Sequence, residues 1–203
     1  MFEPHHRPDP RLPGWGLGFS RGELGGHLVV GHDGILPGFN SSLLVAPDDG
    51  LAIVALTNGS RGAFQWMETE CKRLLRELLD VPDEVVRTDI APRPETWAEL
   101  CGRYRQPPRI SDLRGRLALP AGAEVFARSG RLMIRGLTPI PALYRGLPLH
   151  PDDEHDPDVF RLDLSAFQGM STVRVVFGRD ADGRVNAIHG DMGGQPLSLL
   201  RVR

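Results

Sequence analysis

The stretch of residues 31–39, Gly-His-Asp-Gly-Ile-Leu-Pro-Gly-Phe, constrains the fold of this chain more than any other. It joins two apolar runs, residues 27–30 and residues 43–46, and it places glycine, histidine and aspartate where the first run ends. Glycine accepts positive φ and allows another group to approach the backbone closely. Histidine can transfer protons near neutral pH. The stretch therefore predicts a strand end that turns sharply and can take part in chemistry.

Strand patterns surround this stretch on both sides. Residues 14–19 alternate glycine with large apolar side chains, which predicts a strand, and residues 21–26 then form a glycine-rich turn into a strand over residues 27–32. Two further antiparallel strands are predicted over residues 40–46 and 51–57. The turn between them is Pro47-Asp48-Asp49-Gly50. Together these segments predict an antiparallel meander.

Residues 62–79 change to a helical period. Apolar side chains recur there at spacings of three and four, with charged residues between them. This pattern predicts an amphipathic helix whose apolar stripe packs on the sheet. The predicted stripe consists of Phe64, Met67, Cys71, Leu74, Leu75 and Leu78.

Several motifs of residues 14–58 occur in the order typical of one enzyme family. They are His32-x-Gly34, Pro37-Gly38-Phe39, the turn at residues 47–50, and a strand that ends in Leu56-Thr57-Asn58. This order resembles the C-terminal part of the beta-lactamase-related serine hydrolases, which include class C beta-lactamases, penicillin-binding DD-peptidases, D-aminopeptidases and related esterases. In that family a Lys-Ser/Thr-Gly or His-x-Gly triplet lies on the strand beside the nucleophilic serine.

The resemblance implies a role for each of three residues. His32 would tune proton transfer or contact substrate charge, Gly34 would leave room for substrate, and the N–H of Ile35 would donate to an oxyanion. The implied reaction is hydrolysis of an amide or ester through an acyl-enzyme.

The chain departs from the family at the nucleophile and the base. The family nucleophile lies in Ser-x-x-Lys, but the only lysine is Lys72, with Thr69 three residues before it. Neither Tyr104 nor Tyr144 begins a Tyr-x-Asn motif. We therefore expect the chain to be inactive alone, so whether it acts as an enzyme stays open. The alternatives are a non-catalytic binding or accessory module that uses the later half of the chain, and a hydrolase that uses unrecognised residues.

The later half of the chain carries short alternating segments at regular intervals. Asp182-Gly183 between two of them is a hairpin signal. The expected fold is α+β: an antiparallel sheet with one long C-terminal helix at residues 1–80, a proline-containing linker at 81–94, and an all-β up-and-down barrel of about eight strands at 95–203. This last part resembles the lipocalin-like domain that follows the catalytic domain in some of these hydrolases. The clearest strands are residues 124–128, 131–135, 160–164, 172–178, 184–189 and 197–202.

Composition excludes several classes of partner. The net charge of -2 gives no reason to expect nucleic acid or an acidic membrane surface.

No run approaches the roughly 18 apolar residues of a membrane-spanning helix, and no signal peptide pattern begins the sequence, so the expected location is cytoplasmic by default. The expected partners are a complementary chain that carries the catalytic front half, or a second copy of this chain.

Other reactive residues favour structural interpretations, so no cofactor and no metal are expected. His5 and His6 lie in a proline-rich arm that lacks a frame for further ligands. The spacing of Cys71 and Cys101 fits no zinc motif. The acidic loop at residues 152–156 is expected to be solvated. Ser41, Ser42 and His189 lack the context of a nucleophile or a dyad.

Overall fold

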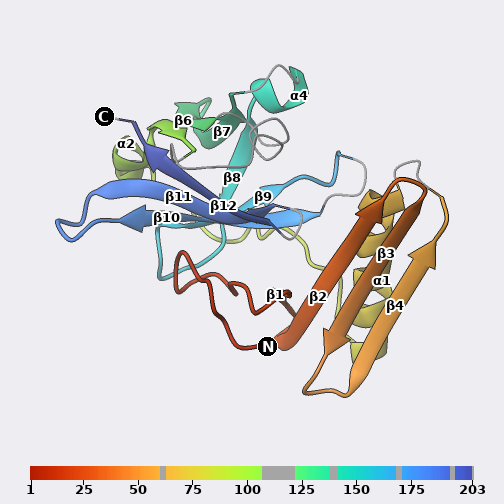
Figure 1. The fold of residues 1–203 in the computed structure, drawn as a ribbon. Helices are drawn as coiled ribbons and strands as arrows, with labels where there is room; N and C mark the ends of the chain where they lie inside the picture. Colours follow the sequence, from red (N-terminus) through yellow and green to blue (C-terminus); the bar gives the residue numbers. More distant parts are fainter. Residues whose placement is uncertain (60–62, 107–121, 138–140, 168–170, 193–194, 203) are drawn as a thin grey trace. The chain divides into compact units, whose positions relative to one another are not determined.

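The computed structural model describes residues 1–59, 63–106, 122–137, 141–167, 171–192 and 195–202 (Figure 1). The chain divides into two compact units, each considered by itself below. Unit 1 comprises Met1–Val85 with Leu164–Thr172 and Gly193–Gln195, and unit 2 comprises Val86–Asp163, Val173–Met192 and Pro196–Arg203.

Unit 1 contains a four-stranded antiparallel sheet in the order β1-β2-β3-β4, as the meander pattern predicts. The turn between β2 and β3 is Pro37-Gly38, and Gly38 has a φ of 87°, as the third residue of a type II turn requires. The strands are β1 (Ser20–Leu24), β2 (His27–Leu36), β3 (Phe39–Ala46) and β4 (Leu51–Thr57).

The strand predicted over residues 14–19 is wrong. The segment forms only isolated bridges, from Trp15 to His6 and to Ser20, and the first strand lies instead in the predicted turn region, with Gly25 and Gly26 as the turn. Glycine weakens a strand because it contributes no packing side chain. Gly14 and Gly18 take positive φ, which bends the chain out of a ladder.

Helix α1 (Ala63–Leu79) packs on one face of this sheet. Cys71 and Leu75 form a core with Val29, Leu44 and Ala46. The apolar stripe predicted for α1 includes two residues that do not pack on the sheet. Leu74 and Leu78 are 41% and 60% exposed, because they lie on the side of α1 that faces away from the sheet. The side chain of Phe64 lies outside the described residues.

The opposite face of the sheet presents apolar side chains to solvent. Phe39, Val54 and Leu56 are 63%, 63% and 78% exposed, because the strand alternation points them away from α1. Val30 on this face is fully buried. The N-terminal arm folds back near its neighbour Arg21, whose guanidinium donates to the carbonyl oxygens of Phe2 and Pro13.

Unit 2 is a closed antiparallel barrel of eight strands, which confirms the predicted barrel. Its strands follow one another around the barrel, and β12 closes it by pairing with β5. The structure adds two strands to the six that the sequence marks most clearly, β5 and β8, and β8 contains Pro148. The strands are β5 (Gly102–Arg105), β6 (Gly122–Arg128), β7 (Arg131–Gly136), β8 (Leu147–Pro151), β9 (Val159–Asp163), β10 (Thr172–Arg179), β11 (Val185–Met192) and β12 (Gln195–Arg201).

Aromatic side chains fill the barrel. The rings of Tyr104 and Phe160 each meet Phe177 edge to face, with centroids 6.1 and 5.6 Å apart. The Tyr104 hydroxyl donates to the carbonyl oxygen of Leu100 at 2.7 Å. This bond ties the barrel to the short helices before it, η1 (Pro94–Thr96) and α2 (Trp97–Leu100). A further short helix, α4 (Pro141–Tyr144), packs against β7.

Candidate active-site strand

The candidate site is the end of β2, where the strand runs past its neighbour. Pairing of β1 with β2 stops at Ser20 and Gly31, whereas pairing of β2 with β3 continues to Leu36 and Phe39. Within the described residues no strand therefore pairs with the β1-side edge of residues 32–36. The main-chain groups on that edge can bind another molecule.

The pairing at the beginning of β1 decides which amides face this edge. Arg21 N–H donates to Gly14 and Gly16 N–H donates to Phe19, so the main-chain groups of Ser20 point the other way, toward β2. The main-chain N–H and C=O of its partner, Gly31, must then point toward β1. Main-chain direction alternates along a strand, so Ile35 presents its N–H to the same edge as Gly31, beyond the reach of β1. This amide is the donor that the family resemblance implies.

His32 is fixed by the loop before β1. Its Nδ1 lies 2.7 Å from the carbonyl oxygen of Gly18, a contact in which Nδ1 carries the proton and donates. The ring also meets Phe19 edge to face, with centroids 6.4 Å apart. Protonated Nδ1 leaves Nε2 as the acceptor in the neutral ring. His32 is exposed, so Nε2 is open to a proton from a bound group.

Gly34 lies on the same face of β2 as His32 and opposite Ser41 of β3. A Cβ at Gly34 would stand 2.4 Å from the Ser41 hydroxyl oxygen. Any larger residue would displace that hydroxyl and fill the space above the strand. The structure thus brings His32, Gly34 and Ile35 together along one strand end, with the first two on one face and the amide of the third at the edge.

Asp33 points to the opposite face, toward α1. Burial raises the pKa of its carboxyl, and the hydroxyl of Ser42 partly offsets this shift. Burial also raises the pKa of the Cys71 thiol on α1, which lowers its reactivity. Asp33 therefore lies on the helix side of the sheet, where its side chain remains exposed, and the face of the strand end that carries His32 has no carboxylate from the triplet.

The residues nearest to a Ser-x-x-Lys pattern do not form a nucleophile. Lys72 on α1 pairs with Glu68 at 2.6 Å, one helical turn earlier. This surface pair follows the ordinary i,i+4 geometry of a helix. The end of β2 can donate a hydrogen bond to a carbonyl oxygen through Ile35 and exchange a proton through His32. The chain supplies no attacking group from a Ser-x-x-Lys motif.

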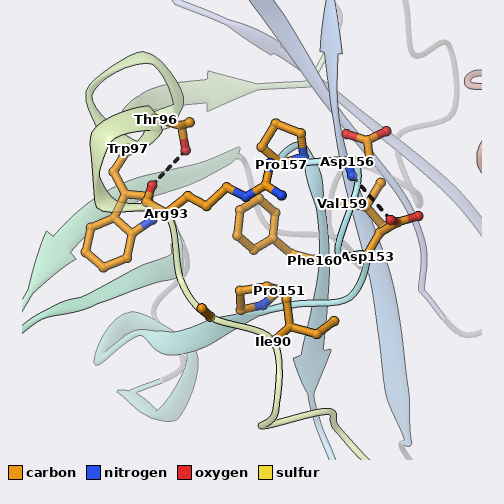
Figure 2. A pocket seen from close by; sticks show the side chains of 11 residues that line it. Ile90, Arg93, Thr96, Trp97, Pro151, Asp153, Asp156, Pro157, Val159 and Phe160 are labelled. Atoms are coloured by element: carbon orange, nitrogen blue, oxygen red, sulfur yellow. Dashed lines mark hydrogen bonds between the residues drawn. The ribbon is translucent and has the colours of Figure 1, made fainter.

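A small pocket in unit 2 is the other candidate (Figure 2). Ile90, Trp97 and Phe160 form its apolar walls, and Arg93 reaches over it to the carbonyl oxygen of Glu154. Its cavity volume is about 10 Å³, which is room for about one water molecule. The residues around this pocket therefore pack the segment before α2 against the β8–β9 loop, and we assign the pocket no ligand.

Further polar residues stabilise the structure. Within the described residues no group of three or more His, Cys, Asp or Glu side chains could hold a metal ion. In the acidic loop, Asp152 is almost fully buried and pairs with Arg161 and Arg174. His189 Nδ1 lies 3.0 Å from the Ser198 hydroxyl, a pair that sequence spacing does not reveal because the two residues lie on separate strands.

No helix within the described ranges has the length and apolar character to cross a membrane.

Comparison with protein families finds a match in the first part of the chain. Residues 1–70 match the family model described as Beta-lactamase. The match supports a beta-lactamase-related fold for this part of the chain and a relationship to serine hydrolases. No curated protein sequence matches the chain.

Solved structures extend the likeness along the chain. The crystal structure of SurE with D-Leu is 25% identical over 95% of this chain, with a TM-score of 0.53, and the match covers 39% of SurE. The crystal structure of SurE is 24% identical over 94% of the chain, with a TM-score of 0.53 and 38% of that protein covered. The octameric penicillin-binding protein homologue from Pyrococcus abyssi is 17% identical over 93% of the chain, with 37% covered and a TM-score of 0.32. The chain thus spans about two fifths of the length of SurE.

Proposed function

We propose that this chain supplies the substrate-binding back part of an acyl-transferring serine hydrolase, whose nucleophile comes from a polypeptide segment outside this sequence. The observation that carries the proposal is the unpaired edge of β2, which presents the amide of Ile35 beside His32 and Gly34. Fixed backbone donors stabilise a developing oxyanion because they need no rearrangement during the reaction.

Each residue of the triplet has a chemical task in this proposal. The Ile35 amide donates to the carbonyl oxygen of the substrate and holds the oxyanion that forms on attack. His32, held through Nδ1 by Gly18, accepts or returns a proton at Nε2 or contacts substrate charge. Gly34 keeps the space above the strand open for the acyl group. The attacking hydroxyl and its base come from Ser-x-x-Lys and Tyr-x-Asn motifs that this sequence does not contain.

The proposed acyl group carries a D-configured amino acid. Support comes from the likeness to SurE, whose crystal structure was determined with D-Leu, and from the sequence resemblance to D-aminopeptidases and DD-peptidases. The barrel of unit 2 corresponds in this proposal to the lipocalin-like domain of such hydrolases.

The first experiment tests the isolated chain. We expect no burst of product with p-nitrophenyl acetate, a chromogenic beta-lactam or a D-leucyl anilide, and no covalent label from a serine-directed phosphonate. A stoichiometric burst or a label on the chain would overturn the proposal. The residue that carried the label, Ser41 among the candidates, would then identify an independent hydrolase.

The second experiment supplies the missing part. A polypeptide with the Ser-x-x-Lys and Tyr-x-Asn motifs of the family is mixed with the chain, and D-leucyl and L-leucyl esters are compared. We expect activity only in the mixture, with preference for the D-ester. Ile35→Pro removes the oxyanion donor, so kcat should fall roughly 100- to 1,000-fold.

Ile35→Val is the matched control, since it keeps the N–H and should keep the activity. Equal activity of Ile35→Pro and Ile35→Val would show that the edge amide has no catalytic role.

A further inference from the structure

Strands β5, β6 and β7 and the segment that includes α4 carry a strongly basic group of side chains. Within the described residues of these segments there are six arginines and one acidic residue, Glu124, although the whole chain has a net charge of -2. The positive charge is thus concentrated on one part of unit 2. The arginines are Arg103, Arg105, Arg128, Arg131, Arg135 and Arg145.

The strand register places most of this charge on the outside of the barrel. Tyr104 points into the barrel, so its neighbours Arg103 and Arg105 point outward. Arg103 pairs across strands with Glu124, which in turn lies opposite Arg135. These residues therefore form one continuous surface, which we call the arginine face: the outward residues of β5, β6 and β7 with Tyr144 and Arg145.

Two aromatic rings hold one arginine at the centre of the arginine face. The guanidinium carbon of Arg135 lies 5.2 Å from the ring centre of Phe126 and 5.1 Å from that of Tyr144. The same group donates to Glu124 at 2.8 Å. Tyr144 nevertheless remains 53% exposed. A preorganised arginine beside an exposed tyrosine is the composition that binding hot spots favour.

Four other arginines of this face have no acidic side chain beside them that the structure describes. Arg128 and Arg131 lie directly opposite each other across the β6–β7 hairpin, where like charges destabilise a strand pair. Both are exposed, as are Arg105 and Arg145, and the described residues show no ion pair for these four side chains. An uncompensated pair of this kind is stabilised by a negatively charged partner.

We propose that the arginine face binds an acidic protein surface. The guanidinium groups would each take a carboxylate with two parallel hydrogen bonds, and Tyr144 would supply the apolar contact at the centre. Arginine, tyrosine, phenylalanine and methionine are the residues enriched at protein interfaces, and Met133 completes this set beside Phe126.

A protein partner accounts for this surface better than a nucleic acid or a membrane. Phe126, Met133 and Tyr144 stand among the arginines, and aromatic and methionine side chains combined with arginine are the composition of a protein interface. The face has no large aliphatic group that would insert into lipid, since its outward residues other than Phe126, Met133 and Tyr144 are charged or small.

The experiment measures binding of the full chain to a poly-L-glutamate peptide, with duplex DNA and anionic phosphatidylserine vesicles as parallel probes. We expect the peptide to bind, and to bind at least about tenfold more weakly when salt rises from about 0.1 M to about 1 M. The double variant Arg128→Glu/Arg131→Glu should lose this binding. Arg184→Glu changes an exposed arginine on the β10–β11 turn, outside the arginine face, and should bind as the parent does.

Tyr144→Ala separates a built interface from mere charge. We expect it to weaken peptide binding severalfold with the net charge unchanged. Absence of peptide binding, equal loss in Arg184→Glu, no effect of Tyr144→Ala, or tighter binding of DNA or vesicles would each overturn the proposal. The double variant replaces one exposed pair of like charges by another, so it is expected to fold as the parent does, and circular dichroism checks this directly.

Discussion

Gly31 and Ile35 present their main-chain amides to the same edge of β2, but among the described residues only Gly31 has a strand opposite it. Both amides belong to the set that faces β1, whereas the alternate set, which includes Gly34, faces β3. The set that faces β1 therefore ends in a donor that no described strand uses and that is free for a substrate.

Proline substitution should distinguish these two sets. Ile35→Pro removes an amide that no strand uses, and edge positions tolerate proline. Gly34→Pro removes an amide that faces Ser41 of β3, so it should cost at least about 1 kcal/mol more in the free energy of unfolding. Urea unfolding of both variants provides the measurement. A larger loss in Ile35→Pro would show that the amide directions are reversed, and equal losses would contradict the assignment of a free amide to Ile35.

Adjacent leucines of α1 should differ sharply. Leu75 is fully buried against the sheet, so Leu75→Ala should lower the free energy of unfolding by about 2–5 kcal/mol. Leu74 is 41% exposed, and Leu74→Ala should cost much less. Comparable losses in denaturant titrations would contradict the orientation of the helix.

Tyr104 should make the barrel sensitive to alkali. Burial raises the pKa of Tyr104 to about 12, above its ordinary value of 10.0. The unfolded chain therefore loses this proton first, so its contribution to stability is complete below pH 10 and falls as the pH rises toward 12.

Tyr104→Phe should abolish that part of the pH dependence, while it also lowers stability at neutral pH by about 1 kcal/mol through loss of the bond to Leu100. Unfolding followed at a series of pH values gives both effects. A parallel decline in parent and variant above pH 10 would assign the alkaline loss to other groups.

Unit 2 should fold without unit 1, which tests the proposed linker at residues 81–94. A fragment of residues 95–203 retains every barrel strand and is expected to unfold cooperatively. A fragment of residues 86–203 should be more stable, because it also keeps Ile90, which is 9% exposed, and the contacts of Arg87 and Arg93 with Glu154. Absence of a cooperative transition in the shorter fragment would place the boundary earlier.

The exposed apolar face of unit 1 should support self-association. We propose a homodimer through residues 14–46, with a buried area in the typical range of about 1,200–2,000 Å². Phe39→Lys should make the chain monomeric in sedimentation at micromolar concentration, since Phe39 is 63% exposed on that face. Leu78→Lys on the flank of α1 is the control. A monomeric parent chain would contradict the homodimer.

Local signals made much of the fold predictable. Asp182-Gly183 marks the β10–β11 hairpin because its turn chemistry is unusually specific. The β8 strand escapes prediction because Pro148 lacks the amide that most strands use. The glycines of residues 14–19 suggest a strand from their spacing alone, although two of them take positive φ.

The candidate site was predictable only in part. The triplet of His32, Gly34 and Ile35 stands in the sequence as a motif, and its role rests on resemblance. The Ile35 amide is left unpaired because β1 pairs with β2 only as far as Ser20 and Gly31, an end point that no local pattern encodes. The His32 contact with Gly18 is equally non-local.

Closure of the barrel by β12 sets the order in which the two units acquire structure. Each pairing in the β1–β4 sheet joins strands that are neighbours in sequence, whereas the contact of Arg201 with Cys101 spans 100 residues. Forming a distant pairing requires closing a long loop before any stabilising contact rewards it, so folding slows as such contacts dominate. We therefore expect the sheet of unit 1 to assemble early. The barrel keeps two open strand edges until its last strand arrives, and we expect aggregation to compete most strongly in that interval.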